Sequence, residues 1–276
     1  MTGTLAQLIA LAAYGNQFLK TGVVDPAFYP VNSTFQNCEV IDFHEFRKPF
    51  FFRKYADNIL RKDPLDWLDL LKKEKTKKLH LFFRHSEDQS TAADYRLAGF
   101  IGGGGTWMIE QQCQGYSYYW SARWQLKEAP ETQSADHQTT WIVNYARFAR
   151  KIKSTQSLQN PEVVRQEFRQ ALSDIASFAF QQNLKGWAET FQKALYELTN
   201  LSPGELYYYK DFVPDKAFNQ LSLQLLFAAS KAWVFGGMGS WNDLSFDDKE
   251  IAGRYEELSS LLYNSIVECV KVVVNE

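Results

Sequence analysis

The period at which hydrophobic residues recur changes once along this chain of 276 residues, and this change limits the folds it can adopt. Across residues 38–150 apolar and polar side chains tend to alternate, which is the period of a β-strand. Across residues 161–276 apolar side chains recur every three or four positions, which is the period of an α-helix. Strands and helices that occupy separate parts of a chain indicate an α+β fold. We therefore predict an antiparallel sheet in the N-terminal half, with a bundle-like helical C-terminal half packed against it.

The connection between the two halves is short, since only residues 151–160 separate them. Hydrophobic residues make up 45% of the chain and charged residues 22%, so the chain can bury a full core and is not disordered as a whole. We expect one α+β domain over residues 1–276, strand-rich at 38–150 and helix-rich at 161–276.

Residues 116–126 carry the clearest strand pattern. Trp120, Ala122, Trp124 and Leu126 follow strict period two with polar residues between them, which predicts a sheet packed on one face. Further strands are expected at 79–84, at 97–111 and at 40–53, where Pro49 indicates an edge strand or a break. Residues 140–149 fit either a strand or the start of a helix.

Helices are expected at both ends of the chain. In the N-terminal part we expect one helix at the start and a second that begins at Asp63-Pro64, an N-cap followed by proline. In the C-terminal half we expect helices from residue 161 onward, at 217–235 and at 246–273. Helical spacing near the start of the chain is shown by Leu5, Leu8, Ile9 and Ala12.

Charge and cysteine content exclude several functions. The net charge is −2 and the pI about 6.1, which gives no electrostatic reason to expect binding to nucleic acid or to an anionic membrane. No stretch has the length of a membrane span, and no signal peptide is expected. Three scattered cysteines, Cys38, Cys113 and Cys269, form no disulfide framework and no metal-ligand pattern. We predict free thiols, a cytoplasmic location, no metal and no cofactor.

The run Gly102–Gly105 suggests a phosphate-binding loop, but its context does not fit one. A P-loop ends in Gly-Lys followed by Ser or Thr, whereas Thr106-Trp107 follows here. We expect a turn, or a strand crossing too close for any side chain.

Two motifs in the strand-rich half suggest chemistry. Histidines near carboxylates could serve a hydrolase as general bases, although no HExxH or GxSxG motif is present. Tryptophans could instead line a site for a glycan or another small ligand. The residues of the hydrolase alternative are His80, His85, Glu87, Asp88 and Glu110, and those of the ligand-binding alternative are Trp107, Trp120 and Trp124.

The segment 233–243 (WVFGGMGSWND) is the most unusual in the helical half. Three glycines within four residues cannot continue a helix cheaply, so the chain must turn here among large apolar side chains. Such a turn is either an inter-helix loop or a rigid aromatic surface that anchors a partner. The predicted binding residues are Trp233, Phe235, Met238, Trp241, Asn242 and Asp243.

Together with the helix that follows it (YEELSSLLYNSIVECV), this segment resembles the C-terminal region of uncharacterised bacterial proteins associated with the immunity proteins of polymorphic toxin systems. The resemblance covers residues 232–276. It implies a protein that neutralises a bacterial toxin by direct contact. We therefore predict a non-catalytic binding protein with a protein partner, and keep the hydrolase and the small-ligand binder as alternatives.

Overall fold

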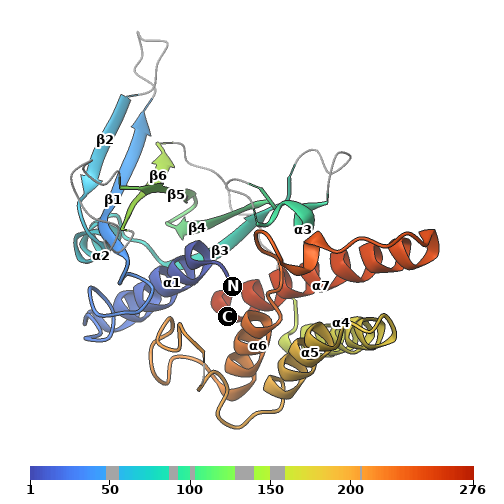
Figure 1. Cartoon of the computed structure of the whole chain (residues 1–276). Coiled ribbons are helices and arrows are strands. Elements are labelled where there is room, and N and C mark those ends of the chain that lie inside the picture. The colour runs from blue at the N-terminus through green and yellow to red at the C-terminus, as the bar shows by residue number, and fades with distance from the viewer. Residues whose placement is uncertain (48–55, 87–92, 100–102, 128–139, 150–158, 206) are drawn as a thin grey trace, which may run out of the picture.

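The computed structural model describes residues 1–47, 56–86, 93–99, 103–127, 140–149, 159–205 and 207–276. It has the predicted α+β organisation, with a sheet in the N-terminal half and helices in the C-terminal half (Figure 1). The predicted edge strand or break at Pro49 and residues 151–158 of the predicted connection lie outside the described residues.

Six strands form one sheet in the order β2-β1-β6-β5-β4-β3. The described helices include four that follow the sheet in sequence, α4 to α7. The strands are β1 (Cys38–Arg47), β2 (Ala56–Arg61), β3 (Lys78–Arg84), β4 (Thr106–Gln112), β5 (Ser117–Leu126) and β6 (Trp141–Phe148). The helices are α1 (Gly3–Thr21), α2 (Pro64–Lys73), α3 (Asp94–Leu97), α4 (Pro161–Gln181), α5 (Lys185–Glu197), α6 (Gln220–Lys231) and α7 (Lys249–Asn275), with a short 3-10 turn at Trp241–Asp243.

The sheet is mixed, which corrects the prediction of an antiparallel one. Strand β1 pairs in parallel with β6, and the other neighbouring strands are antiparallel. The reason is connectivity: β2 folds back along one edge of β1, and the other edge is taken by β6, which runs in the same direction as β1. The alternative left open for residues 140–149 is thereby settled as a strand.

The predicted strand at 97–111 begins later than expected. Residues Asp94–Leu97 form the short helix α3, and β4 starts at Thr106. Gly104 and Gly105 have φ values of +72° and +81°, which interrupt a strand and form a turn that only glycine adopts readily.

Helix α1 is less amphipathic than its sequence suggests, because it is enclosed rather than lying on the surface. Every residue from Leu5 to Gly15 is buried. The helix runs along one face of the sheet, beside α2, and also contacts α7 (Figure 1). Two of its polar side chains form hydrogen bonds inside the protein: the Gln7 amide oxygen accepts one from the Tyr145 hydroxyl at 2.6 Å, and the Asn16 amide donates one to the Leu79 carbonyl at 2.8 Å.

The helix starts follow the capping residues in the sequence. The side chains of Asp63, Asn160, Asn219 and Asp248 each accept a hydrogen bond from a main-chain N–H in the first turn of a helix. The helices expected at 217–235 and 246–273 are therefore observed at 220–231 and 249–275. None of the helices in the described part of the chain combines the length and hydropathy that crossing a membrane requires.

The two halves are joined through the end of α7. The side chain of Asn275 is fully buried, accepts a hydrogen bond from the Leu81 N–H at 2.6 Å and donates one to the Leu81 carbonyl at 2.8 Å. It thus occupies the edge of β3 as a further strand would. The Lys78 ammonium group donates to the Asn275 carbonyl at 2.7 Å.

Candidate functional site

The sheet opens between β4 and β5. These strands pair from Gln112–Ser117 to Met108–Ser121, and the pairing stops there. Beyond that point β4 continues beside β3, up to the pair Arg84–Thr106, and β5 continues beside β6, up to Leu126–Trp141. The two strands therefore diverge, and a space is left between them.

A cavity of about 780 Å³ lies at this opening. It is bounded by the sheet, the first turn of α1, the glycine turn before β4, the chain just after α6 and the middle of α7. Its size is in the range of small-molecule binding sites. The lining residues that carry rings are Trp107, Trp124, Trp141, Tyr209, Trp233 and Tyr263.

These rings come from six separate segments of the chain, and four of them meet as two pairs. The ring centroids of Trp124 and Trp141 are 5.8 Å apart, and those of Trp233 and Tyr263 are 5.9 Å apart. The indole nitrogens of Trp107 and Trp124 have no hydrogen-bond acceptor among the described residues. A mainly apolar lining with a few polar atoms that lack hydrogen-bond partners is typical of a ligand site.

The glycine turn brings the main chain close to this wall. A Cβ atom at Gly103 would lie 2.3 Å from the Leu97 carbonyl oxygen, and one at Gly105 would lie 2.3 Å from the Phe83 ring. The Tyr263 hydroxyl donates a hydrogen bond to the Gly104 carbonyl. Residues 103–105 of the glycine run thus serve close packing and a turn, as expected.

Arg123 carries the only charge in the described lining at neutral pH. Burial raises the pKa of the Cys38 thiol and of the Tyr209 and Tyr263 hydroxyls, so these groups stay neutral. No Asp or Glu is among the described lining residues. Within the described residues Arg123 has no carboxylate partner, and the cavity therefore favours a neutral or anionic ligand.

The structure divides the predicted tryptophan site. Trp107 and Trp124 line the cavity, but Trp120 is fully buried, and its ring meets Trp67 at a centroid distance of 6.1 Å in the core. Leu126, expected on the packed face, is 57% exposed because it lies near the end of the strand.

The structure also divides the residues predicted at 233–243. Trp233 lines the cavity, whereas Phe235 and Trp241 are buried in the core. The Trp241 indole donates to the Ser259 hydroxyl at 2.8 Å, and the Asp243 carboxylate accepts from main-chain N–H groups of the loop itself. Met238 is fully exposed.

This loop is packed against α3 and the residues that follow it. A Cβ atom at Gly99 would lie 1.8 Å from the Gly236 carbonyl oxygen. The Asn242 side chain donates to the carbonyls of Arg96 and Gly236, both at 3.2 Å. The segment 94–99 and the loop 233–243 are thus neighbours, and each contributes to the cavity lining, through Gly99 and Trp233.

The two histidines of the hydrolase alternative lie in separate pairs, His80 with the predicted Glu110 and His85 with Asp94, which was not predicted. The His80 Nδ1 atom lies 3.5 Å from the buried Glu110, which also accepts hydrogen bonds from Ser117 and Tyr119. Burial, and then the Glu110 charge, raise the pKa of Tyr119 to about 12.

The second pair could not be found from sequence spacing. The His85 Nδ1 atom lies 2.8 Å from the buried carboxylate of Asp94, and the imidazole is half exposed. Glu87 and Asp88 lie outside the described residues. The structure describes no Ser, Thr or Cys side chain hydrogen-bonded to His85, so this pair lacks a nucleophile within the described residues.

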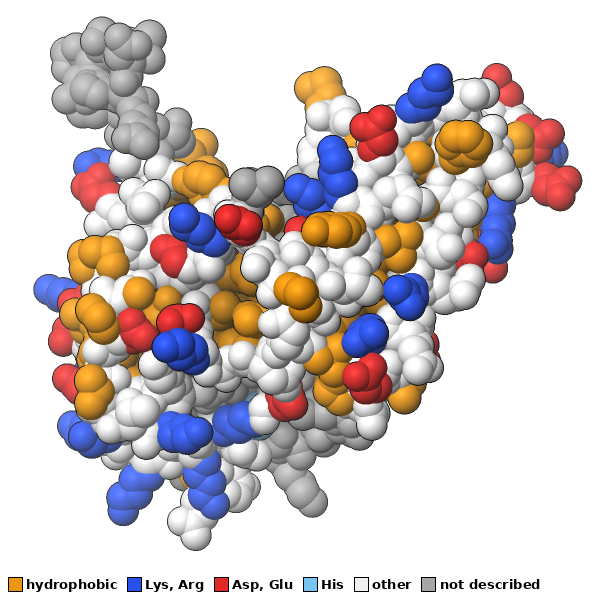
Figure 2. Space-filling view, turned by 90° about the horizontal axis from the view of Figure 1, so that it is seen from below, with side chains coloured by type: hydrophobic (Ala, Val, Ile, Leu, Met, Phe, Trp, Pro, Cys, Tyr) orange, Lys and Arg blue, Asp and Glu red, His pale blue; other side chains and the backbone are white. Residues whose placement is uncertain are grey.

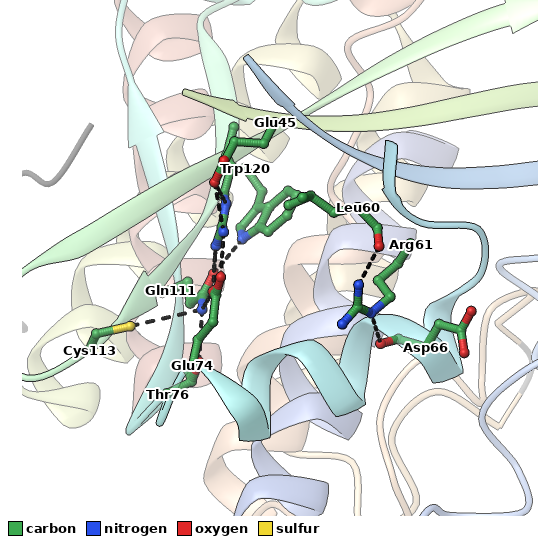
Figure 3. Close-up of polar contacts among 10 residues, drawn as sticks. Glu45, Leu60, Arg61, Asp66, Glu74, Thr76, Gln111, Cys113 and Trp120 are labelled. Carbon is green, nitrogen blue, oxygen red and sulfur yellow. Dashed lines mark hydrogen bonds and ion pairs between the residues drawn. The ribbon is translucent and has the colours of Figure 1, made fainter. Parts of the chain in front are cut away.

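The sequence analysis also missed a buried ionic network on the sheet (Figure 3). The Arg147 guanidinium donates to Glu45 at 2.9 Å, to Glu74 at 2.6 Å and to Gln111 at 2.8 Å. It also lies 4.1 Å from the centre of the Tyr118 ring. These groups satisfy one another inside the protein, away from the cavity lining, which indicates a structural role.

Among the described residues, no three His, Cys, Asp or Glu side chains are grouped as a metal site requires. Comparisons of the chain with protein-family models, with curated proteins and with solved structures find no match. The functional argument therefore depends on the geometry of the cavity.

Proposed function

We propose that this protein is a binding protein that holds a ring-bearing small molecule in the cavity between β4 and β5. The observation that carries the proposal is the set of ring side chains around a space of about 780 Å³. Tryptophan and tyrosine rings stack on flat or ring-shaped ligands and supply most of the contact area in such sites.

The convergence of separate sequence features supports the same site. Residues 103–105 of the glycine run, two of the three predicted sheet tryptophans and Trp233 from the helical half all line this cavity. Several of the glycines needed around it leave no room for a Cβ atom, so the backbone there is closely packed and the cavity shape is pre-formed.

Binding is tested by tryptophan fluorescence and thermal shift against a panel of monosaccharides, oligosaccharides, aromatic acids and short peptides. We expect at least one class to bind, and the substitutions Trp124→Ala and Trp233→Ala to weaken binding about tenfold or more. Tyr196→Ala is the matched control, because Tyr196 is 64% exposed and lies away from the cavity. A panel in which no compound binds, or equal losses in all three variants, would contradict the proposal.

A second candidate function is direct contact with a protein partner, as the immunity-protein resemblance implies. The specific observation is a mainly apolar groove of about 830 Å³ between α4 and α5, with Phe180 70% exposed. Figure 2 shows hydrophobic side chains gathered among charged ones on the face viewed there. Calorimetric titration with the products of neighbouring genes tests this candidate. Phe180→Ala should weaken a true contact, and Trp233→Ala should leave it unchanged.

A further inference from the structure

Strand β5 offers main-chain hydrogen-bonding groups to the cavity. Just past the Leu126–Trp141 pair, the Lys127 N–H donates to the Thr140 carbonyl at 3.1 Å. In an antiparallel ladder hydrogen-bonded and non-hydrogen-bonded pairs alternate. Counting back from this bonded pair, Trp124 and Val143 form a non-hydrogen-bonded pair. The N–H and C=O of Trp124 therefore point away from β6.

The hydrogen bonds on the opposite side of β5 also indicate that the N–H and C=O of Trp124 point away from β6. There the Cys113 N–H donates to the Tyr116 carbonyl at 2.8 Å, so every second residue from Tyr116 onward faces β4. Trp124 belongs to this series, but β4 has already diverged at its level. Its main-chain N–H and C=O thus have no strand partner within the described residues.

The cavity runs along this free edge. Its lining includes the four consecutive residues 122–125 of β5. Because successive side chains of a strand point to opposite faces, a cavity that contacts four in a row reaches the edge of the strand as well as one face. A bound molecule therefore contacts the tryptophan rings of the lining and also the unpaired main-chain groups of β5.

We propose that the ligand is a short peptide that binds in extended conformation, pairs with the free edge of β5 at Trp124 and places an aromatic side chain among the cavity rings. This inference depends on the proposed function and narrows it from ring-bearing molecules in general to peptides. Peptides complete a free strand edge through alternate N–H and C=O groups, which sugars and aromatic acids do not offer in that spacing.

The charge of the cavity lining further restricts which peptides can bind. Arg123 is the charged side chain of the described lining, and no carboxylate faces it there. An acidic residue or a free carboxyl terminus on the peptide would complement it. The probe that follows is acetyl-Phe-Ala-Phe-Asp.

The test compares this peptide with two analogues, one N-methylated at the alanine and the other at the second phenylalanine. A strand edge uses alternate amides, so we expect one analogue to bind about tenfold more weakly and the other to bind nearly as well as the parent. Arg123→Gln should weaken binding of the parent about tenfold and leave unchanged the binding of acetyl-Phe-Ala-Phe-Asn amide, which carries neither the side-chain nor the terminal carboxylate. Equal binding of both analogues would overturn edge pairing.

The outcomes separate this inference from the proposed function. If sugars or aromatic acids bind and no peptide does, the peptide assignment fails and the cavity proposal stands. If nothing in the panel binds, both fail. The same four residues flanked by Gly-Ser segments should bind at least about tenfold more weakly, because the cavity encloses a short molecule. If the flanked form binds as tightly as the parent, the assignment of the ligand as a free peptide is wrong, and the site binds a segment of a partner protein.

Discussion

Arg147 shows how one residue can connect distant parts of the chain. Its guanidinium is 2% exposed and bonds to Glu45 on β1, Glu74 after α2 and Gln111 on β4. A buried charge that loses its partner is costly, since the remaining charges stay out of water.

We expect Arg147→Leu to lower the free energy of unfolding by about 3–5 kcal/mol, because the buried Glu45 carboxylate would then lose its ion pair with the guanidinium. Urea denaturation measures this loss. Arg123→Leu is the control on the neighbouring strand: its side chain is exposed and has no carboxylate partner among the described residues, so about 0.5 kcal/mol or less is expected. Equal losses in the two variants would contradict the structural role of the network.

The same network predicts a dependence of stability on pH. Burial alone would raise the pKa of Glu74, but the hydrogen bonds and charge of Arg147, with help from Gln111 and Arg61, outweigh it and lower the pKa below 4.5. A carboxyl group whose pKa is lower in the folded state stabilises the fold above its unfolded pKa, and that contribution is lost as the pH falls through the folded pKa.

Glu74→Gln should therefore be less stable than the parent at pH 7, and the gap should narrow as the pH falls from about 5 to 3. Melting temperatures measured across this range test the prediction. A gap that stays constant over the whole range would show that ionisation of Glu74 does not contribute.

At the level of elements, the loop 233–243 connects α6 to α7 and is held in place by side chains that pack in the core. Trp241 fills the core against Phe191, with ring centroids 5.1 Å apart, and its carbonyl accepts a hydrogen bond from Tyr255 at 2.7 Å. Met238, three residues earlier, is fully exposed. Within one short segment the structure thus separates a side chain that holds the fold from one free to contact other molecules.

Trp241→Ala should cost about 3–5 kcal/mol of stability, as expected for removal of a large buried ring. Met238→Ala should change stability by about 0.5 kcal/mol or less, since its side chain is in solvent. Chemical denaturation followed by circular dichroism distinguishes the two. A similar cost for both would mean that the loop is held by its tip and not by its tryptophan.

Elements governed by local chemistry could be predicted from the sequence. Asp63 and Asn160 marked helix starts because a capping side chain acts within its own turn. The period-two pattern around Trp120 located β5, because the alternation of side chains along a strand is also a local property. The start of β4 was misplaced, because the positive φ angles of Gly104 and Gly105 depend on packing against other parts of the chain.

At the scale of the whole molecule, the parallel β1–β6 pairing and the cavity were beyond prediction for a common reason. Both are made by residues far apart in the sequence, and no local pattern specifies which segments meet. The sequence identified Trp107, Trp124 and Trp233 as notable, but their meeting at one cavity depends on where β4 and β5 diverge. That the chain forms one domain stays a prediction.

The parallel pairing of β1 with β6 also has a consequence for biosynthesis. Register partners such as Glu45 and Arg147 are 102 positions apart in the sequence. Pairing these strands therefore closes a long loop, which has an entropic cost. While the ribosome is still making the intervening segment, one side of β1 has no neighbour. Nascent chains should therefore be most prone to aggregation before β6 leaves the exit tunnel, and a chaperone that shields strand edges would act in that interval.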